Sequence, residues 1–221
     1  MNERKLQITD DGSHTLYSEE ARETYHSTYG AIQESEHIFI NACLNTDICQ
    51  KLKNVRILEV GTGTGLNILL AYNWSVKSKI PVTYYGYEPF PIRKNETLLL
   101  NYPEILGVDK RLFFLMHDNK GKFINLSNKF SVFIVEDKIE NVKLHPDVYD
   151  VVFFDAFSPD AQPEIWTVEI FNSLFKSIKR GGVLTTYSCK GNVKRSLEEV
   201  GFVVEKLPGP PGKREFLRAW K

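Results

Sequence analysis

The segment VRILEVGTGTGLN, residues 55–67, joins a short apolar run to a loop rich in glycine. The apolar run is typical of a buried β-strand, and residues 66–74 after the loop have the pattern of a helix. Glycines allow such a loop to turn sharply and to approach a ligand closely. The segment therefore predicts a strand, a ligand-binding loop and a helix, which together form the first unit of an α/β fold.

Strand and helix patterns continue to alternate after this unit. We expect strands at 82–89, 131–137, 149–155, 182–188, 202–207 and 215–220, and helices at 91–102, 164–180 and 192–201. Strands that alternate with helices form a parallel sheet covered on both faces. The last two strands have no helix between them and must pair antiparallel. We therefore predict a mostly parallel, seven-stranded α/β sheet of the Rossmann-like class, with one antiparallel strand near its edge.

Two regions fall outside this alternation. Residues 1–50 precede the first strand, and we expect an N-terminal extension that packs on a core formed by residues 51–221, within a single domain. Residues 103–130 fit poorly and are interpreted as an insertion. Within them RLFFLMHD (111–118) is an alternative third strand, but 131–137 is preferred because it leaves only a short crossover to the next strand.

The composition is that of an ordinary globular protein, with 42% hydrophobic and 25% charged residues among 221. The N-terminus is polar, and no apolar run approaches the roughly 20 residues of a membrane helix. Three scattered cysteines and five histidines without ligand spacing argue against a disulfide framework or a metal site. We expect a cytoplasmic protein that binds no membrane and no metal.

The formal net charge is zero, but the charges are unevenly distributed. Residues 176–221 contain 11 Lys and Arg against 4 Glu, a net charge of +7. A basic end of this kind can contact phosphate groups, although it can equally be a solvated surface.

Acidic residues end four of the predicted strands: Glu59, Glu88, Asp137 and Asp155. In a parallel sheet these ends lie at the edge where ligands bind. The loop glycines are Gly61, Gly63 and Gly65, whereas a dinucleotide-binding loop requires glycine at the position of Leu66. The loop instead resembles that of Rossmann-like methyltransferases, which cradle S-adenosylmethionine.

Each acid has a distinct predicted role. Glu88 follows Gly65 by 23 residues, and a carboxylate there can accept hydrogen bonds from both ribose hydroxyls. Asp137 can accept from the adenine amino group, with Asp118 as the alternative. We count Glu59 and the three glycines with the cofactor-binding residues.

Asp155 ends the most apolar strand and begins a turn stiffened by Pro159 and Pro163. Methyltransferases that act on amines often carry Asp or Asn here, followed by proline. An alkyl amine with a pKa near 10 needs roughly 4 kcal/mol to reach its nucleophilic free base at neutral pH. A carboxylate beside the nitrogen can orient the amine and accept its proton. We therefore predict that Asp155 is catalytic, while a helix-capping or turn role stays open.

The turn sequence is also specific to one family. DAFSPDAQPEIWTVEIFNSL (155–174) resembles the signature of the methyltransferase that completes 5-methylaminomethyl-2-thiouridine in tRNA. In this family the methyltransferase is one half of bifunctional MnmC-type enzymes, or it exists alone as an MnmD-like form. The positions in step are Asp155, Ala156, Phe157, Ser158, Pro159, Pro163, Trp166, Phe171 and Asn172. GTGTGLN (61–67), YPEI (102–105), residues 213–215 and residues 11–40 are similar to other tracts of the family, so the resemblance covers nearly the whole chain.

The resemblance implies methyl transfer from S-adenosylmethionine to the exocyclic amine of 5-aminomethyl-2-thiouridine at the tRNA wobble position. It implies that Asn67 helps to hold the cofactor. It also implies that five residues are candidates for binding the substrate or tRNA: Tyr17, Glu34, Phe157, Lys213 and Arg214. We expect no oxidase domain in this chain, so that a separate FAD-dependent oxidase would supply the aminomethyl substrate.

Three alternatives remain open at this point. An aminopropyltransferase of polyamine synthesis also places Asp near an amine, but its glycine loop usually contains an acid where this chain has threonines. A second alternative is a non-catalytic module that binds S-adenosylmethionine and RNA, which the intact turn at Asp155 disfavours. An NAD enzyme is disfavoured by Leu66.

Overall fold

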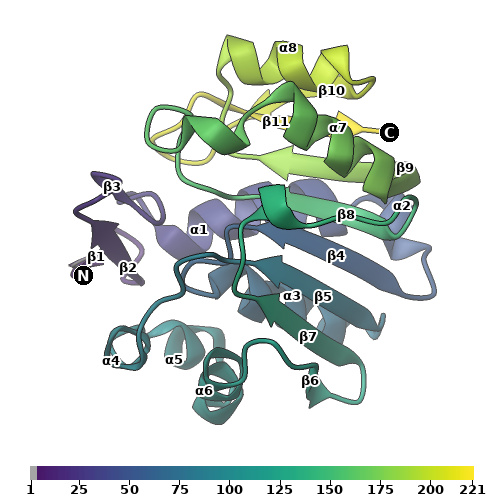
Figure 1. The fold of residues 1–221 in the computed structure, drawn as a ribbon. Coiled ribbons are helices and arrows are strands. Elements are labelled where there is room, and N and C mark those ends of the chain that lie inside the picture. Colours follow the sequence, from purple (N-terminus) through teal and green to yellow (C-terminus); the bar gives the residue numbers. More distant parts are fainter. Residues whose placement is uncertain (1–3) are drawn as a thin grey trace.

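A central sheet of eight strands runs through the protein, with helices on both of its faces (Figure 1). The structure, a computed structural model, describes residues 4–221. Along the central sheet the strands follow the order β10-β11-β9-β8-β4-β5-β7-β6. A second sheet, β1-β2-β3, has three antiparallel strands and lies beyond the ends toward which the parallel strands point (Figure 1).

The parallel strands form the middle of the central sheet. Strands β7, β5, β4, β8 and β9 pair parallel to one another, whereas β11 pairs antiparallel with both β9 and β10. The strands are β4 (Val55–Val60), β5 (Val82–Tyr87), β6 (Ile124–Ser127), β7 (Phe130–Val135), β8 (Tyr149–Phe154), β9 (Ile178–Thr186), β10 (Val203–Pro208) and β11 (Glu215–Trp220). The predicted mostly parallel sheet with a reversed strand near one edge is confirmed. The antiparallel edge strand β6 was not predicted.

Helices form the crossovers between the parallel strands. They are α3 (Leu66–Ser78), α4 (Lys94–Thr97), α5 (Tyr102–Leu106), α6 (Lys110–Asp118), α7 (Val168–Ser177) and α8 (Gly191–Glu199), with short 3₁₀ turns at η2 (Ile139–Asn141) and η3 (Pro163–Ile165). The third parallel strand is β7, as preferred, and the alternative strand at 111–118 is wrong because α6 occupies these residues. Residues 103–130 supply α5, α6 and β6, and they lie within the crossover from β5 to β7.

Helix α7, which follows the turn after Asp155, is shorter than predicted. Thr167 caps its first turn by accepting from the backbone N–H of Ile170 at 3.4 Å. The helix ends at Ser177, because the next residue, Ile178, begins β9 and pairs with Tyr149 of β8. Residues 178–180, which we predicted as the end of this helix, therefore belong to β9, and the register of β9 against β8 shifts between Ile178 and Val183.

Part of the N-terminal region covers the carboxyl ends of the parallel strands. They form β1 (Arg4–Ile8), β2 (His14–Ser18), β3 (Glu23–Thr24), α1 (Ala31–Ser35), the π-helix η1 (Glu36–Leu44) and α2 (Asp47–Gln50). Helices α1 and η1 pack against α3, and η1 also contacts β9. The backbone N–H of His14 donates to Asn101 Oδ1 at 2.9 Å, which ties β2 to the start of α5.

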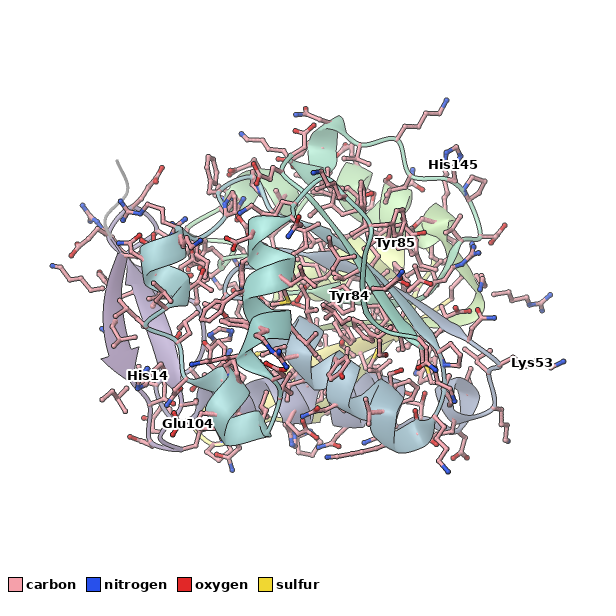
Figure 2. All side chains as sticks on the ribbon, turned by 90° about the horizontal axis from the view of Figure 1, so that it is seen from below. His14, Lys53, Tyr84, Tyr85, Glu104 and His145 are labelled. Carbon is pink, nitrogen blue, oxygen red and sulfur yellow. The ribbon has the colours of Figure 1, made fainter. Side chains whose placement is uncertain are left out.

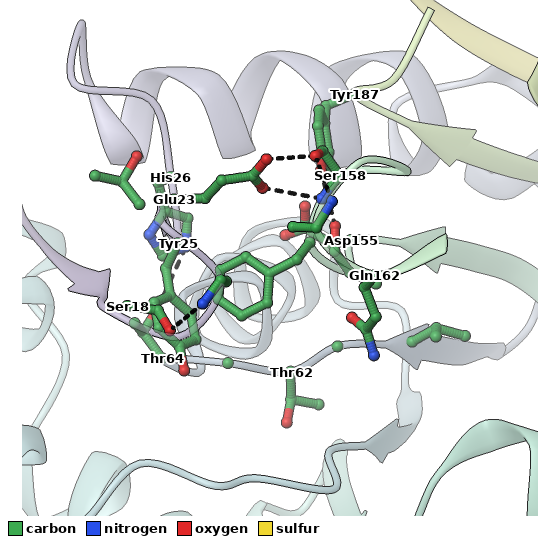
Figure 3. A pocket seen from close by; sticks show the side chains of 18 of the residues that line it. Ser18, Glu23, Tyr25, His26, Thr62, Thr64, Asp155, Ser158, Gln162 and Tyr187 are labelled. Atoms are coloured by element: carbon green, nitrogen blue, oxygen red, sulfur yellow. Dashed lines mark hydrogen bonds between the residues drawn. The ribbon is translucent and has the colours of Figure 1, made fainter. Parts of the chain in front are cut away.

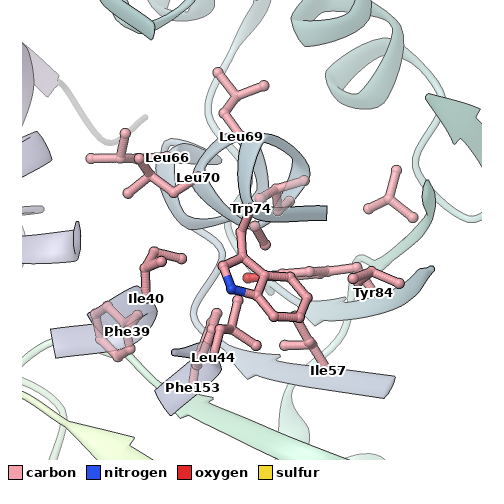
Figure 4. Packing of buried hydrophobic residues seen from close by; sticks show 14 of the residues in the cluster. Phe39, Ile40, Leu44, Ile57, Leu66, Leu69, Leu70, Trp74, Tyr84 and Phe153 are labelled. Carbon is pink, nitrogen blue, oxygen red and sulfur yellow. The ribbon is translucent and has the colours of Figure 1, made fainter. Parts of the chain in front are cut away.

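The core has two parts, one on each face of the sheet. Successive residues of β8 alternate between them, with Val151 and Phe153 on the α3 face and Val152 and Phe154 on the α7 face. This double burial explains why residues 151–154 of β8 are all apolar. Figure 4 shows the α3 face, where Trp74 packs among aliphatic and aromatic side chains from several elements.

Side chains differ widely in exposure. Tyr84 is fully buried in β5, whereas the charged side chains of Lys53 and Glu104 are exposed (Figure 2). Within residues 4–221, no helix combines the length and apolar character required to cross a membrane.

Candidate active site

A cavity of about 650 Å³ opens at the carboxyl ends of β4, β5 and β8, beneath the N-terminal sheet (Figure 3). This volume lies within the roughly 300–1,000 Å³ of small-molecule sites. Most of the predicted site residues line it: Tyr17, Glu34, Gly61, Gly63, Asn67, Glu88, Asp155, Phe157 and Lys213. Glu59, Gly65, Asp137 and Arg214 do not.

The glycine loop follows β4 and forms the floor of the cavity. Gly61 has φ 85°, and a Cβ placed on it would lie 2.7 Å from the backbone oxygen of Asp155. Gly63 has φ 47°, and its Cβ would lie 2.7 Å from the ring of Tyr25. Both positions therefore require glycine for conformation and for space. Gly65 instead caps the N-terminus of α3 and lies against α6.

Glu88 is held rigidly at the end of β5. Its Oε2 accepts from the backbone N–H of Gly63 at 2.8 Å, and its Oε1 accepts from that of Phe90 at 2.9 Å. The carboxylate is largely buried, and this burial raises its pKa. Glu88 thereby links the glycine loop to β5 while it faces the cavity.

Asp155 lies at the end of β8, where its backbone N–H donates to the carbonyl oxygen of Val60 at 2.9 Å. Its Oδ2 accepts from Asn67 Nδ2 at 2.8 Å. Burial, followed by the charges of Glu59 and Glu34, raises the pKa of the Asp155 carboxyl well above its usual range. A carboxyl with a raised pKa is a stronger proton acceptor than an ordinary Asp, so this site suits general-base chemistry.

Glu59 lies beneath the cavity and has no exposed surface. Its Oε1 accepts from Asn67 Nδ2 at 2.8 Å. Burial raises the pKa of Glu59 to about 8. The structure thus places Glu59 behind Asn67 instead of on the cavity wall.

Neither candidate for the adenine amino group faces the cavity. Asp137 accepts from the backbone N–H of Lys138 and from Asn141 Nδ2, both at 2.7 Å. Asp118 is exposed at the end of α6, with its Oδ2 at 3.5 Å from Lys94 Nζ. The cavity wall after β7 is formed instead by residues 138–140.

An ion pair lies next to the turn that begins at Asp155. Lys213 Nζ lies 2.8 Å from Glu34 Oε1 and 4.0 Å from the centroid of the Tyr187 ring. The Tyr187 hydroxyl donates to the carbonyl oxygen of Ala156 at 2.9 Å. Residues from α1, from the loop before β11 and from the end of β9 therefore meet around the turn that begins at Asp155.

The remaining predicted substrate residues separate into two groups. Tyr17 in β2 and Phe157 in the turn line the cavity, and the Phe157 ring lies edge-on to Tyr25 with centroids 4.9 Å apart. Arg214 is exposed and lies outside the cavity.

Glu23, which was not among the predicted site residues, holds the turn that follows Asp155. The carboxylate of Glu23, at the start of β3, accepts from the backbone N–H of Ser158 at 3.0 Å and from its hydroxyl (Figure 3). Glu23 and Ser158 are 135 residues apart, so no local sequence pattern predicts their contact. The Glu23–Ser158 clamp fastens the N-terminal sheet to the turn that carries Asp155.

A second unpredicted contact fastens the opposite side of the cavity. Arg4 Nε donates to the Tyr25 hydroxyl at 2.7 Å, and its Nη1 lies 3.1 Å from Glu96 Oε2. Its Nη2 donates to the carbonyl oxygen of Phe90 at 2.5 Å. The N-terminal sheet is therefore attached on both sides of the cavity.

Within residues 4–221, no group of three or more His, Cys, Asp or Glu side chains is placed to hold an ion.

Comparison with known proteins gives the fold class. Residues 115–221 match the model of a family described as S-adenosyl-L-methionine-dependent methyltransferase. The crystal structure of MnmC2 from Aquifex aeolicus superposes with a TM-score of 0.79 and 29% identity, over 100% of this chain and 71% of that one. The fold is that of a class I methyltransferase. The predicted cofactor, S-adenosylmethionine, is that of the matched family.

Sequence relatives confirm the predicted resemblance. The bifunctional MnmC of Leptospira interrogans is 28% identical over 92% of this chain, and an uncharacterized protein of Methanocaldococcus jannaschii is 29% identical over 99%. The chain spans 33% of the first protein and 60% of the second. Spermidine synthase from Thermotoga maritima, at a TM-score of 0.61 and 13% identity, shares the fold alone.

Proposed function

We propose that this protein transfers a methyl group from S-adenosylmethionine to the exocyclic amine of 5-aminomethyl-2-thiouridine at the wobble position of tRNA. The observation that carries the proposal is the Asp155 carboxylate, which lines the same cavity as the glycine loop and Glu88. Similarity to proteins of tRNA 5-methylaminomethyl-2-thiouridine biosynthesis supports this substrate. The chain matches only about a third of the length of these proteins. The reaction that it catalyses is therefore inferred from the residues of its own cavity.

The residues of the cavity fit the cofactor. Gly63 lets the loop pass directly beneath the Tyr25 ring, and Gly61 lets the loop approach Asp155 closely. Each oxygen of Glu88 accepts one backbone N–H and retains the capacity to accept from a ribose hydroxyl. These residues would hold the cofactor together with Asn67. When bound, S-adenosylmethionine supplies an electrophilic methyl group on a positively charged sulfonium.

Asp155 would act on the amine. An alkyl ammonium must lose a proton before its nitrogen becomes nucleophilic, at a cost of roughly 4 kcal/mol at neutral pH. Burial raises the pKa of Asp155 toward that of the amine, which reduces the cost of transferring this proton to the carboxylate. The Glu34–Lys213 pair and Phe157 would form the walls that orient the substrate.

The basic end of the chain would contribute to tRNA binding only in part. Several of its cations are already paired, including Lys190 with Asp160 and Lys206 with Glu215. Arg214 is exposed beside the cavity residue Lys213 and is the better phosphate candidate. A separate FAD-dependent oxidase would supply the aminomethyl substrate in the cytoplasm.

Transfer of labelled methyl to tRNA that lacks the final methyl group tests the proposal. Purified protein is incubated with labelled S-adenosylmethionine and this tRNA, and the wobble nucleoside is identified by mass spectrometry. The expected product is 5-methylaminomethyl-2-thiouridine. Fully modified tRNA serves as the negative control.

Two other results would redirect the assignment. Transfer of an aminopropyl group from decarboxylated S-adenosylmethionine to putrescine would favour a polyamine enzyme. Cofactor binding without turnover on any hypomodified tRNA would favour a binding module.

A further inference from the structure

One side-chain amide joins two carboxyl groups behind the cavity wall. Asn67, in the first turn of α3, donates from Nδ2 to Glu59 Oε1 and to Asp155 Oδ2, at 2.8 Å in each case. An amide nitrogen carries two hydrogens and the amide oxygen carries none. Both of its hydrogens are therefore used, and the amide orientation is fixed by the two carboxyl groups.

Glu59 cannot contact a ligand in the cavity directly. It has no exposed surface, and it is absent from the cavity wall that its neighbours Val60 and Gly61 form. Within residues 4–221, the hydrogen bond that links Glu59 to the cavity wall is the one from Asn67 Nδ2 to its Oε1. Glu59 can therefore act on the reaction by holding Asn67, and its charge also acts on Asp155 through space.

Asn67 determines how the Asp155 carboxylate is presented. The bond to Oδ2 fixes the rotation of the carboxylate, and no donor within residues 4–221 bonds to Oδ1. The free oxygen remains available on the side of the cavity. A carboxylate that must accept a proton from a bound amine benefits from such fixed orientation, since catalytic groups act best from one prearranged geometry.

We infer that Glu59 is a positioning residue, which holds Asn67 so that Asp155 presents Oδ1 to the substrate amine. This inference rests on the proposed function and extends it to a residue buried outside the cavity. It differs from a cofactor-binding role for Glu59, because it links Glu59 to the rate of transfer and not to the affinity for S-adenosylmethionine.

Variants at position 59 separate these roles. Glu59→Leu removes the acceptor for Asn67, and we expect kcat to fall by about 100-fold, the loss that follows a displacement of roughly 1 Å in a catalytic group. Glu59→Gln keeps an oxygen that accepts from Asn67, and it should recover most of that rate. The Kd for S-adenosylmethionine, measured by calorimetry, should stay within about threefold of wild type in both variants. Weakened cofactor binding with unchanged kcat would overturn the inference.

A double-mutant cycle tests whether the residues act as one unit. Asn67→Ala should lose a factor in kcat similar to that of Glu59→Leu, and the double variant should lose no more than either. Losses that multiply would show independent roles. If Glu59→Leu does not fold, Glu59→Gln still tests the inference through the same kcat and Kd values, because weakened binding of S-adenosylmethionine with unchanged kcat in this variant would overturn it.

A crystal structure provides a readout that needs no tRNA. With S-adenosylhomocysteine bound, Asp155 should keep its rotamer in Glu59→Gln and change it in Asn67→Ala. An unchanged rotamer in Asn67→Ala would contradict the inference. Wild-type protein that methylates no tRNA would instead refute only the proposed function, so the two failures are distinguishable.

Discussion

Replacement of Glu59 by Gln should change how the stability of the protein depends on pH. In the folded protein burial raises the pKa of Glu59 from 4.5 to about 8. Between these values the folded state holds a proton that the unfolded state has lost. The stability present below pH 4.5 is therefore lost progressively as the pH rises to about 8.

The size of this effect follows from the two pKa values. The interval from 4.5 to about 8, at about 1.4 kcal/mol for each pH unit, corresponds to about 5 kcal/mol. Gln does not titrate, so the free energy of unfolding of Glu59→Gln, relative to wild type, should rise by up to about 5 kcal/mol over this range.

Urea unfolding of the cofactor-free protein at several pH values between 4.5 and 9 measures this difference. The matched control is Glu104→Gln, because Glu104 is exposed on α5 (Figure 2). Its difference from wild type should stay nearly constant across the range. Parallel pH profiles for wild type and Glu59→Gln would refute the reasoning, because they would show that Glu59 is not buried as a neutral carboxyl.

Two further substitutions test the loop and the clamp. Gly61→Ala should abolish S-adenosylmethionine binding in calorimetry, because the added Cβ would lie 2.7 Å from the Asp155 backbone oxygen. The control is Gly121→Ala: Gly121 has a similar φ, but a Cβ there would have no atom within 4 Å, so this variant should lose only about 1–2 kcal/mol of stability. Equal cofactor affinity in both glycine variants would contradict this account. Glu23→Ala should speed amide hydrogen exchange in residues 14–24. Ser158→Ala should speed this exchange less, because it keeps the backbone N–H that donates to Glu23. Unchanged exchange in Glu23→Ala would show that the clamp does not hold the N-terminal sheet.

Much of the central sheet was predictable because its strands are buried on both faces. Residues 149–154 are buried throughout, and such runs indicate central parallel strands with little ambiguity. The segment 111–118 was harder, since an apolar run alone also suits a strand. Its spacing resolves the ambiguity: Phe113, Met116 and His117 are buried at i, i+3 and i+4, which is helical periodicity. The edge strand β6 is short and half polar, so it gave no comparable signal.

The candidate site was predictable where position in the chain determines geometry. Glycines of a βα turn and acids just after a strand must lie at the carboxyl edge of the sheet, and Glu88 and Asp155 line the cavity accordingly. Glu59 differs because it lies inside β4, where its side chain is directed beneath the loop. Asp137 differs because its carboxylate accepts hydrogen bonds from Lys138 and Asn141 in the loop that follows β7.

Contacts between segments far apart in the chain could not be predicted from local sequence. The Glu23–Ser158 clamp, the Arg4–Glu96 pair and the Glu34–Lys213 pair each join the N-terminal region to a different part of the core. Their partners are set by the packing of the N-terminal sheet over the cavity. A single sequence shows the charges but not which of them meet.

Single-turnover methyl transfer by Asp155→Asn is the most direct test of the central claim, that this carboxylate accepts the proton of the substrate amine. Asn keeps the shape of the side chain and removes the base, so with saturating cofactor and hypomodified tRNA the rate should fall by about 10²–10⁴-fold. The Kd for S-adenosylmethionine should remain close to that of wild type. A variant that transfers methyl at the wild-type rate would contradict the account.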